Sequence, residues 1–175
     1  MIHITRYKYL FGILLSGVIS SGWALPDDND QPIHIASDQA LLYDTQGIST
    51  YTGNVEITQG SIVLKADKVT IYSENAKITR VEANGKPAHF QQRPAADQSI
   101  MHAYGETINY ELAREVVTLT VQARLENDEN SFTGNRIQYD IKNQKIQAYA
   151  DNNSENEGQR VEMIIQPKPQ NSAGE

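Results

Sequence analysis

Three histidines have side chains that could bind a metal ion or move a proton: His34, His89 and His102. A protein zinc site needs three or four histidine, cysteine or carboxylate ligands, usually at short characteristic spacings. Neither His89 nor His102 has a partner at such a spacing, and the chain has no cysteine. His34 stands between two isoleucines, so alternation along a strand would turn it toward solvent. The sequence therefore predicts no metal site and no cofactor.

Acidic residues are numerous, but none has a context that singles out a general acid or base. The run of Glu126, Asp128 and Glu129 is most simply the solvated tip of a hairpin. The sequence also contains no nucleophile elbow of the G-x-S-x-G type, no phosphate-binding loop and no dinucleotide fingerprint. These observations predict a protein that is not an enzyme.

Basic side chains could instead contact the phosphates of an acidic ligand. They gather in the first half of the chain, at Lys65, Lys68, Lys77, Arg80 and Lys86, and Arg93 follows. The simpler alternative, scattered charge that keeps the protein soluble, is favoured because the formal net charge is −7. The same acidic balance predicts no nucleic-acid partner, which would require a basic face.

The elements that must position these residues are short strands. Apolar and polar residues alternate at Val55 and Ile57, Ile62 and Leu64, Val69 and Ile71, and again through Val117, Leu119 and Val121. Turn residues such as Gln59-Gly60 and Asn84-Gly85 separate these runs. Period-two alternation is typical of half-buried antiparallel strands, and no window shows a helical stripe. The sequence predicts an all-β sandwich, barrel or jellyroll.

A repeat underlies these strands. Four segments begin with Asp or Gly and reach a tyrosine five residues later: Asp38 to Tyr43, Asp67 to Tyr72, Gly105 to Tyr110 and Gly134 to Tyr139. Their starts lie 29, 38 and 29 residues apart, so the first pair maps onto the second. We attribute the longer middle gap to a loop-like insertion that contains Gly85-Lys86-Pro87 and Arg93 to Ala96. The repeat predicts an elongated stack of bent hairpins, each burying the face of its neighbour.

Such a stack has two exposed sheet edges. We expect these edges at Ile33 to Ala36 and at Val161 to Gln166. Edge strands invite pairing with another copy, and a head-to-tail contact that does not close produces a filament. The residues predicted to take part are Ile33, His34, Ile35, Val161, Met163 and Ile165.

The first residues have the features of an export signal. Arg6 and Lys8 precede the apolar run from Leu10 to Ile19, and Gly22 and Ala24 occupy the −3 and −1 positions of a cleavage site. A membrane anchor would need about 20 apolar residues, so an uncleaved anchor is the less favoured alternative. The predicted organisation is a signal peptide over residues 1–24, one domain over 25–160, and a C-terminal edge strand with a flexible tail over 161–175.

Several motifs in order resemble the LptA/OstA family of periplasmic lipopolysaccharide-transport proteins. They are Gln31-Pro32-Ile33-His34-Ile35, Ser37-Asp38-Gln39, Thr52-Gly53-Asn54-Val55, Thr58-Gln59-Gly60, Ala66-Asp67-Lys68-Val69 and Gly85-Lys86-Pro87-Ala88. The match continues through Tyr110-Glu111-Leu112-Ala113 and Ile137 to Ala148. It spans roughly residues 31–160, and the segment after Asp151 is less similar.

The resemblance implies a twisted antiparallel β-jellyroll of about sixteen strands, open at both ends. It also implies that the apolar interior binds the lipid A part of lipopolysaccharide. As partners it implies further copies of the chain and the OstA-like domains of inner-membrane (LptC-like) and outer-membrane (LptD-like) transport proteins. Together these would bridge the periplasm.

The candidate lipid-binding residues are those that alternation turns inward or that lie at a mouth of the stack. They are Ile33, Ile35, Val55, Ile57, Leu64, Val69, Ile71, Phe90, Ile108, Tyr110, Leu112, Leu119, Phe132 and Ile137. For any single residue, ordinary core packing is the favoured alternative. A second hypothesis for the whole protein is a periplasmic scaffold that carries no lipid, and its sign would be an interior filled by side chains without a groove.

Overall fold

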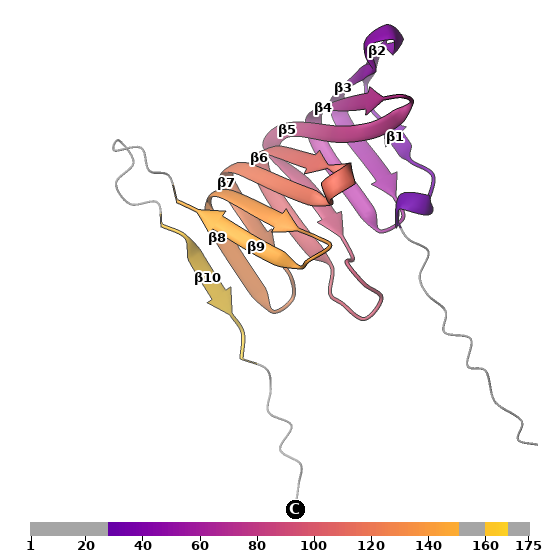
Figure 1. The fold of residues 1–175 in the computed structure, drawn as a ribbon. Helices are drawn as coiled ribbons and strands as arrows, with labels where there is room; N and C mark the ends of the chain where they lie inside the picture. The colour runs from indigo at the N-terminus through magenta and orange to yellow at the C-terminus, as the bar shows by residue number, and fades with distance from the viewer. Residues whose placement is uncertain (1–27, 151–159, 168–175) are drawn as a thin grey trace, which may run out of the picture.

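The computed structural model describes residues 28–150 and 160–167, which form ten β-strands and three short 3₁₀ turns (Figure 1). The strands are β1 (His34–Ala36), β2 (Gln39–Tyr43), β3 (Ile48–Gln59), β4 (Ile62–Glu74), β5 (Lys77–Gln92), β6 (Met101–Glu111), β7 (Val116–Glu126), β8 (Asn130–Asp140), β9 (Lys145–Tyr149) and β10 (Glu162–Ile165). The turns are η1 (Asp28–Asp30), η2 (Asp44–Gln46) and η3 (Leu112–Arg114). No helix that could cross a membrane occurs in these two described ranges. The predicted all-β class is confirmed.

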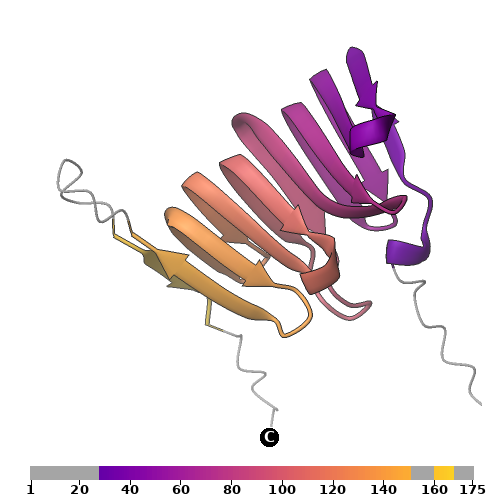
Figure 2. The same ribbon diagram turned by 45° about the horizontal axis from the view of Figure 1, so that its top comes forward.

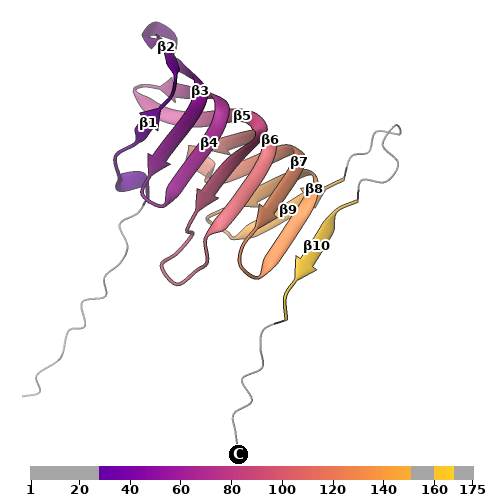
Figure 3. The ribbon, with the colours of Figure 1, turned by 180° about the vertical axis from the view of Figure 1, so that it is seen from behind.

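The strands form one antiparallel sheet in the order β1-β3-β4-β5-β6-β7-β8-β10. At its first edge β1 pairs with the end of β3, whereas β2 pairs with the beginning of β3. At its last edge β10 pairs with the beginning of β8, and β9 pairs with the end of β8. Figures 1 and 3 show the stack running from β1 and β2 at one end to β9 and β10 at the other. Each edge therefore consists of two short strands rather than one.

A column of bulges crosses the sheet and bends it. The pairing register shifts between Thr52 and Val55 in β3, and similar shifts follow in every pair as far as β7 and β8. Bulges bend the strand that carries them and increase its twist. The bend divides the sheet into two facing halves, visible in Figure 2. We name them the β1–β10 arm and the β2–β9 arm after their edge strands, and we call the free side of each arm, away from the bend, its rim.

At the first edge, the bend depends on a glycine. Gly53 has a φ of +81°, and a Cβ there would collide with the carboxylate of Asp38. The Asp38 N–H donates to the Gly53 carbonyl at 2.9 Å, and Asn54 Nδ2 donates to Asp38 Oδ2 at 2.9 Å. Asp38 thus joins the bend of β3 to the break between β1 and β2. Asp67, Gly105 and Gly134 also lie at the bend, which explains the repeat in the sequence.

Two expectations need correction. The described residues form ten strands, fewer than about sixteen, because each of β3 to β8 runs through the bend as one strand. The segment Gly85-Lys86-Pro87 is not part of an inserted loop, because it lies at the bend inside β5. Only the segment that contains Arg93 to Ala96 is a loop, between β5 and β6.

The tyrosines of the repeat are not equivalent. Tyr110 and Tyr139 are buried between the arms, whereas Tyr72 is only partly buried and its ring contacts the guanidinium of Arg80 at 3.8 Å. Val69 and Ile71 take the inward positions in β4, so Tyr72 falls on the opposite face. A shift of one residue along a strand exchanges its two faces. Tyr43 is about half exposed on β2.

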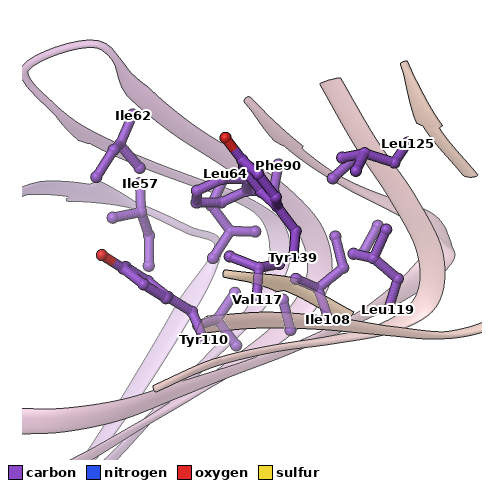
Figure 4. Packing of buried hydrophobic residues seen from close by; sticks show 14 of the residues in the cluster. Ile57, Ile62, Leu64, Phe90, Ile108, Tyr110, Val117, Leu119, Leu125 and Tyr139 are labelled. Carbon is purple, nitrogen blue, oxygen red and sulfur yellow. The ribbon is translucent and has the colours of Figure 1, made fainter. Parts of the chain in front are cut away.

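The core fills the space between the arms (Figure 4). Val55, Leu64 and Phe90 come from the β1–β10 arm, and Val69 and Ile137 come from the β2–β9 arm. Alternation along each strand puts these residues on the inner face. Val121, expected to continue the alternation of β7, instead lies exposed at the bend with a φ of +61°.

The two ends of the stack expose apolar side chains. On β2, Leu41 and Leu42 are more exposed than buried, and on β10 the same is true of Met163, Ile164 and Ile165. The predicted edge segments at 33–36 and 161–166 contain β1 and β10, whereas β2 and β9 were not predicted as edges. The predicted signal peptide lies outside the described residues, as does most of the tail.

Candidate lipid-binding site

The interior holds a narrow apolar slot of about 40 Å³ between the arms, toward the β1–β2 end of the stack. Its wall is almost entirely apolar. The lining residues are Ile33, Ile57, Gln59, Ile62, Leu64, Ile71, Ile78, Val81, Phe90, Ile108, Tyr110 and Leu112. A volume of this size holds a water-sized group, and an acyl chain would enter only if the arms moved apart or side chains rotated.

Both arms build the slot. Ile57, Ile62 and Leu64 face it from the strand ends beside the turn between β3 and β4, and Tyr110 closes it from the other arm near η3. Figure 4 shows Ile57 and Ile62 on one side and Tyr110 across from them. The rings of Phe90 and Tyr110 lie 5.8 Å apart and tilted by 57°. This is a favourable aromatic contact, and the two rings together form part of the slot wall.

The structure places the fourteen predicted lipid-binding residues in two groups. Eight line the slot: Ile33, Ile57, Leu64, Ile71, Phe90, Ile108, Tyr110 and Leu112. The other six pack elsewhere in or against the core: Ile35, Val55, Val69, Leu119, Phe132 and Ile137. For these six, the prediction of lipid contact remains a prediction.

Sequence reasoning missed Ile78 and Val81 as slot residues. Their spacing of three does not match simple alternation, because the register between β4 and β5 shifts at this point, where Tyr72 pairs with Arg80 and Ser73 with Ile78. The alanines that allow the arms to approach, Ala83, Ala88, Ala103 and Ala123, were also missed. Small side chains contribute little to an alternating apolar pattern.

A wider polar cleft of about 760 Å³ opens between the rims of the arms. Turn residues and loop residues of both arms form its walls. The lining residues are Asp28, Gln31, Gly60, Ser61, Gln92, Arg93, Pro94, Ala95, Ala96, Tyr110, Glu115, Ile141, Lys142 and Gln144. Tyr110 lines both this cleft and the slot. An apolar space and a polar space therefore adjoin at one tyrosine.

Asp28 fastens the N-terminal segment to the rim of the β1–β10 arm. Its carboxylate accepts hydrogen bonds from the N–H of Ser61 at 2.6 Å, from the Ser61 hydroxyl at 2.7 Å and from Gln92 Nε2 at 3.1 Å. Gly60, with a φ of +57°, leaves room for this carboxylate, since a Cβ would collide with it. Asp28 thus connects the β3–β4 turn with the end of β5.

The three histidines among the described residues lie outside the slot. His34 is exposed on β1. His89 and His102 are 3.1 Å apart between Nε2 and Nδ1, on the outer face, where His89 also stacks on Tyr104 at 4.5 Å. Across residues 28–150 and 160–167, no group of three or more His, Asp and Glu side chains could hold a metal ion.

Two side chains have shifted pKa values with clear causes. Burial raises the pKa of the Tyr139 phenol, and the carboxylate of Asp140 adds to the increase. Burial also lowers the pKa of His89, and the adjacent His102 and then Lys65 lower it further. Burial thus favours the neutral form of both side chains, Tyr139 in the core and His89 on the outer face.

Comparisons with known proteins agree with this geometry. Residues 34–145 match the family model described as "LptA/(LptD N-terminal domain) LPS transport protein". This range extends from β1 to the first residue of β9 and contains all residues that line the slot except Ile33.

Full-length relatives are also similar. The lipopolysaccharide export system protein LptH of Pseudomonas aeruginosa is 38% identical over 168 residues, covering 94% of this chain and 96% of LptH. The lipopolysaccharide export system protein LptA of Escherichia coli is 36% identical over 161 residues, covering 89% of this chain and 83% of LptA. The crystal structure of LptH, a periplasmic component of the lipopolysaccharide transport device, superposes with a TM-score of 0.74 and covers 81% of this chain and all of that one.

Proposed function

This chain belongs to the LptA/LptD N-terminal domain family of lipopolysaccharide transport proteins, and from this premise we propose that it binds lipopolysaccharide by its acyl chains between the two arms. The observation that carries the proposal is the apolar slot, which Phe90 and Tyr110 line and which adjoins the wider cleft at Tyr110. We take the two facing arms, with both ends of the stack unclosed, as the jellyroll that the family implies.

The energetics suit a carrier that releases its cargo. Each CH₂ group that leaves water contributes about 0.8 kcal/mol. Opening a slot of only about 40 Å³ disrupts packing between Ile57, Phe90 and Tyr110, which offsets part of that gain. The free energy gained by burying the acyl chains, minus the cost of opening the slot, leaves a moderate affinity. Transfer of the lipid from one protein to the next requires such an affinity.

The proposed role is a link in a periplasmic bridge to the outer membrane, without enzymatic activity. The exposed apolar residues of β2 and β10 support head-to-tail association through the two edges. Their partners would be further copies of this chain and the related domains of the inner-membrane and outer-membrane components. The periplasmic location and the signal cleaved after Ala24 belong to the same proposal.

A specific observation also favours the scaffold without lipid. The interior is filled except for the small slot, and a packed interior is the sign expected of a module that only joins other proteins. Binding of lipid discriminates between the two functions, whereas oligomer formation does not.

The experiment is retention of radiolabelled lipopolysaccharide by the purified mature chain, alongside the same lipopolysaccharide after chemical deacylation. We expect the intact form to be retained and the deacylated form to be retained at least tenfold less, because the acyl chains supply the apolar contact. Failure to retain intact lipopolysaccharide, with folded and oligomeric protein, would leave only the scaffold function.

A further inference from the structure

We propose that the polar cleft between the rims binds the phosphorylated sugar headgroup of the lipid, with Gln92, Arg93 and Lys142 as its contacts. This inference rests on the proposed function, because it assigns the second part of the same amphipathic ligand. The slot is almost entirely apolar, so the polar contacts to a headgroup must come from the cleft.

Gln92 carries an unused acceptor. Its Oε1 is buried without a hydrogen-bond partner among the described residues, whereas its Nε2 donates to Asp28 Oδ2 at 3.1 Å. If the amide were flipped, Gln92 Oε1 would face the carboxylate oxygen of Asp28, and the two oxygens would repel each other. Asp28 therefore determines that Oε1 is the amide atom without a partner. A buried acceptor without a donor is unfavourable. Gln92 lines the cleft, so a turn of its side chain toward the opening would bring Oε1 to a ligand that donates a hydroxyl or an amide N–H, as an acylated amino sugar does.

Two cations flank the cleft on opposite arms. Arg93 follows β5 on the rim of the β1–β10 arm, and Lys142 lies in the β8–β9 turn of the other arm. Both are exposed, and within the described ranges neither forms an ion pair. Arg93 Nη1 donates a hydrogen bond to the Gln98 carbonyl at 3.2 Å, which leaves the other N–H groups of the guanidinium for a ligand. Arginine and lysine are the side chains that bind phosphate groups. A ligand with a phosphate at each end could therefore meet one cation on each arm.

The acidic residues of the cleft leave these cations available. The carboxylate of Asp28 already accepts hydrogen bonds from Ser61 and Gln92. Glu115 lines the same cleft, and it is the one other carboxylate there among the described residues. By contrast, Lys65 pairs with Glu56 at 3.6 Å and Arg80 pairs with Glu82 at 3.8 Å, away from the cleft.

The cleft is joined to the slot in the way that an amphipathic ligand requires. Tyr110 lines both, so a headgroup in the cleft would place its acyl chains at the entrance of the slot. The cleft volume of about 760 Å³ lies within the range of sites that hold small ligands. Phosphorylated sugar, rather than a bare anion, matches both the cations and the unused acceptor.

The test compares bisphosphorylated lipid A with dephosphorylated lipid A as ligands of the mature chain. We expect the double variant Arg93→Gln/Lys142→Gln to bind the bisphosphorylated form at least tenfold more weakly and the dephosphorylated form as the wild type does. The control Lys65→Gln/Arg80→Gln removes the same charge away from the cleft and should bind both forms normally.

A second pair of variants tests the acceptor. Gln92→Met should weaken binding of both forms several-fold, whereas Gln91→Met, one residue earlier on the opposite face of β5, should change neither. Circular dichroism verifies that each variant is folded. Glucosamine 1-phosphate, which lacks acyl chains, should not displace lipid A at equal concentration, and displacement would instead indicate a site for free sugar phosphates and overturn the proposal.

The outcomes separate the two proposals. If Arg93→Gln/Lys142→Gln binds bisphosphorylated lipid A like the wild type, or if the control Lys65→Gln/Arg80→Gln loses as much binding, the headgroup site is wrong and the acyl-binding function stands. If the wild type binds neither form of lipid A, the acyl-binding function is wrong and the headgroup site falls with it.

Discussion

The two halves of the interior have the same residue types and the same alternation, but they are packed differently. In the slot half, around β3 to β6, Ile57 is 7% exposed, Ile62 6% and Tyr110 8%. In the sealed half, around β7 and β8, Leu119, Leu125 and Ile137 are all 0% exposed. The apolar slot lies in the first half. Alternation thus determines which residues face inward, whereas the separation of the arms determines whether they leave space.

This difference in packing suggests that one half stabilises the fold and the other half opens to bind lipid. We expect the sealed half to hold the arms together and to supply stability, because Leu119, Leu125 and Ile137 are fully buried there. The slot half already lacks some contacts and can open at a lower cost. Substitutions in the two halves should therefore separate folding from binding.

The largest expected effect is the loss of stability when a side chain in the sealed half is truncated. Leu125→Ala should lower the free energy of unfolding by about 4 kcal/mol, because a fully packed site leaves a cavity. Leu64→Ala, next to the existing void, should lower it by about 2 kcal/mol, because less new contact is lost. Urea unfolding of both variants measures the difference, and equal losses would contradict the distinction between the halves.

Next in size is a substitution that fills the slot. Val81→Phe should weaken lipopolysaccharide retention at least tenfold, since the new ring would occupy the space that acyl chains enter, at a stability cost of about 1–2 kcal/mol. The matched control is Val63→Phe, whose side chain lies on the outer face of β4. Normal retention by Val81→Phe would show that lipid does not use the slot.

A smaller effect concerns the sealed half at alkaline pH. The pKa of Tyr139 is raised first by burial and then by Asp140, so the folded state holds the phenol proton more tightly than the unfolded chain does. This contribution is complete below pH 10 and decreases as the pH rises through the folded-state pKa. Tyr139→Phe should unfold in urea with a shallower loss of stability above pH 10. An identical pH dependence in both proteins would exclude this role of Tyr139.

The smallest effect concerns the outer face of the slot half at acidic pH. Burial, His102, Lys65 and Arg124 lower the pKa of His89, against the opposing carboxylate of Glu126. Stability should therefore be complete above pH 6.5 and decrease slightly as the pH falls from 6.5 to the folded-state pKa. His89→Gln should remove this decrease in urea titrations between pH 5 and pH 7. A decrease of the same size in the variant would assign it to another group.

Part of this structure could be predicted from the sequence. Alternation correctly predicted Val55, Leu64 and Ile137 as inward residues, because period two is a property of the strand itself. It failed where a bulge interrupts that period, as at Ile78 and Val81. At the bend of β7, Val121 and Gln122 have positive φ values although neither is a glycine, so the sequence does not indicate the bend there.

Other features depend on tertiary contacts. The edge strand β2 was missed because Leu41, Leu42 and Tyr43 are consecutive apolar residues without alternation. The polar cleft joins turns far apart in the sequence, from Ser61 to Gln144. Its composition cannot be inferred until the arms are placed opposite each other.

The central claim is tested most directly by photo-crosslinking to lipopolysaccharide from single positions in each half. A crosslinking residue would replace Phe90 or Leu112 in the slot half and Phe132 in the sealed half, with the exposed His34 as the outward control. The account predicts adducts from Phe90 and Leu112, and none from Phe132 or His34. Adducts of equal yield from Phe132, or none from either slot position in folded protein, would contradict it.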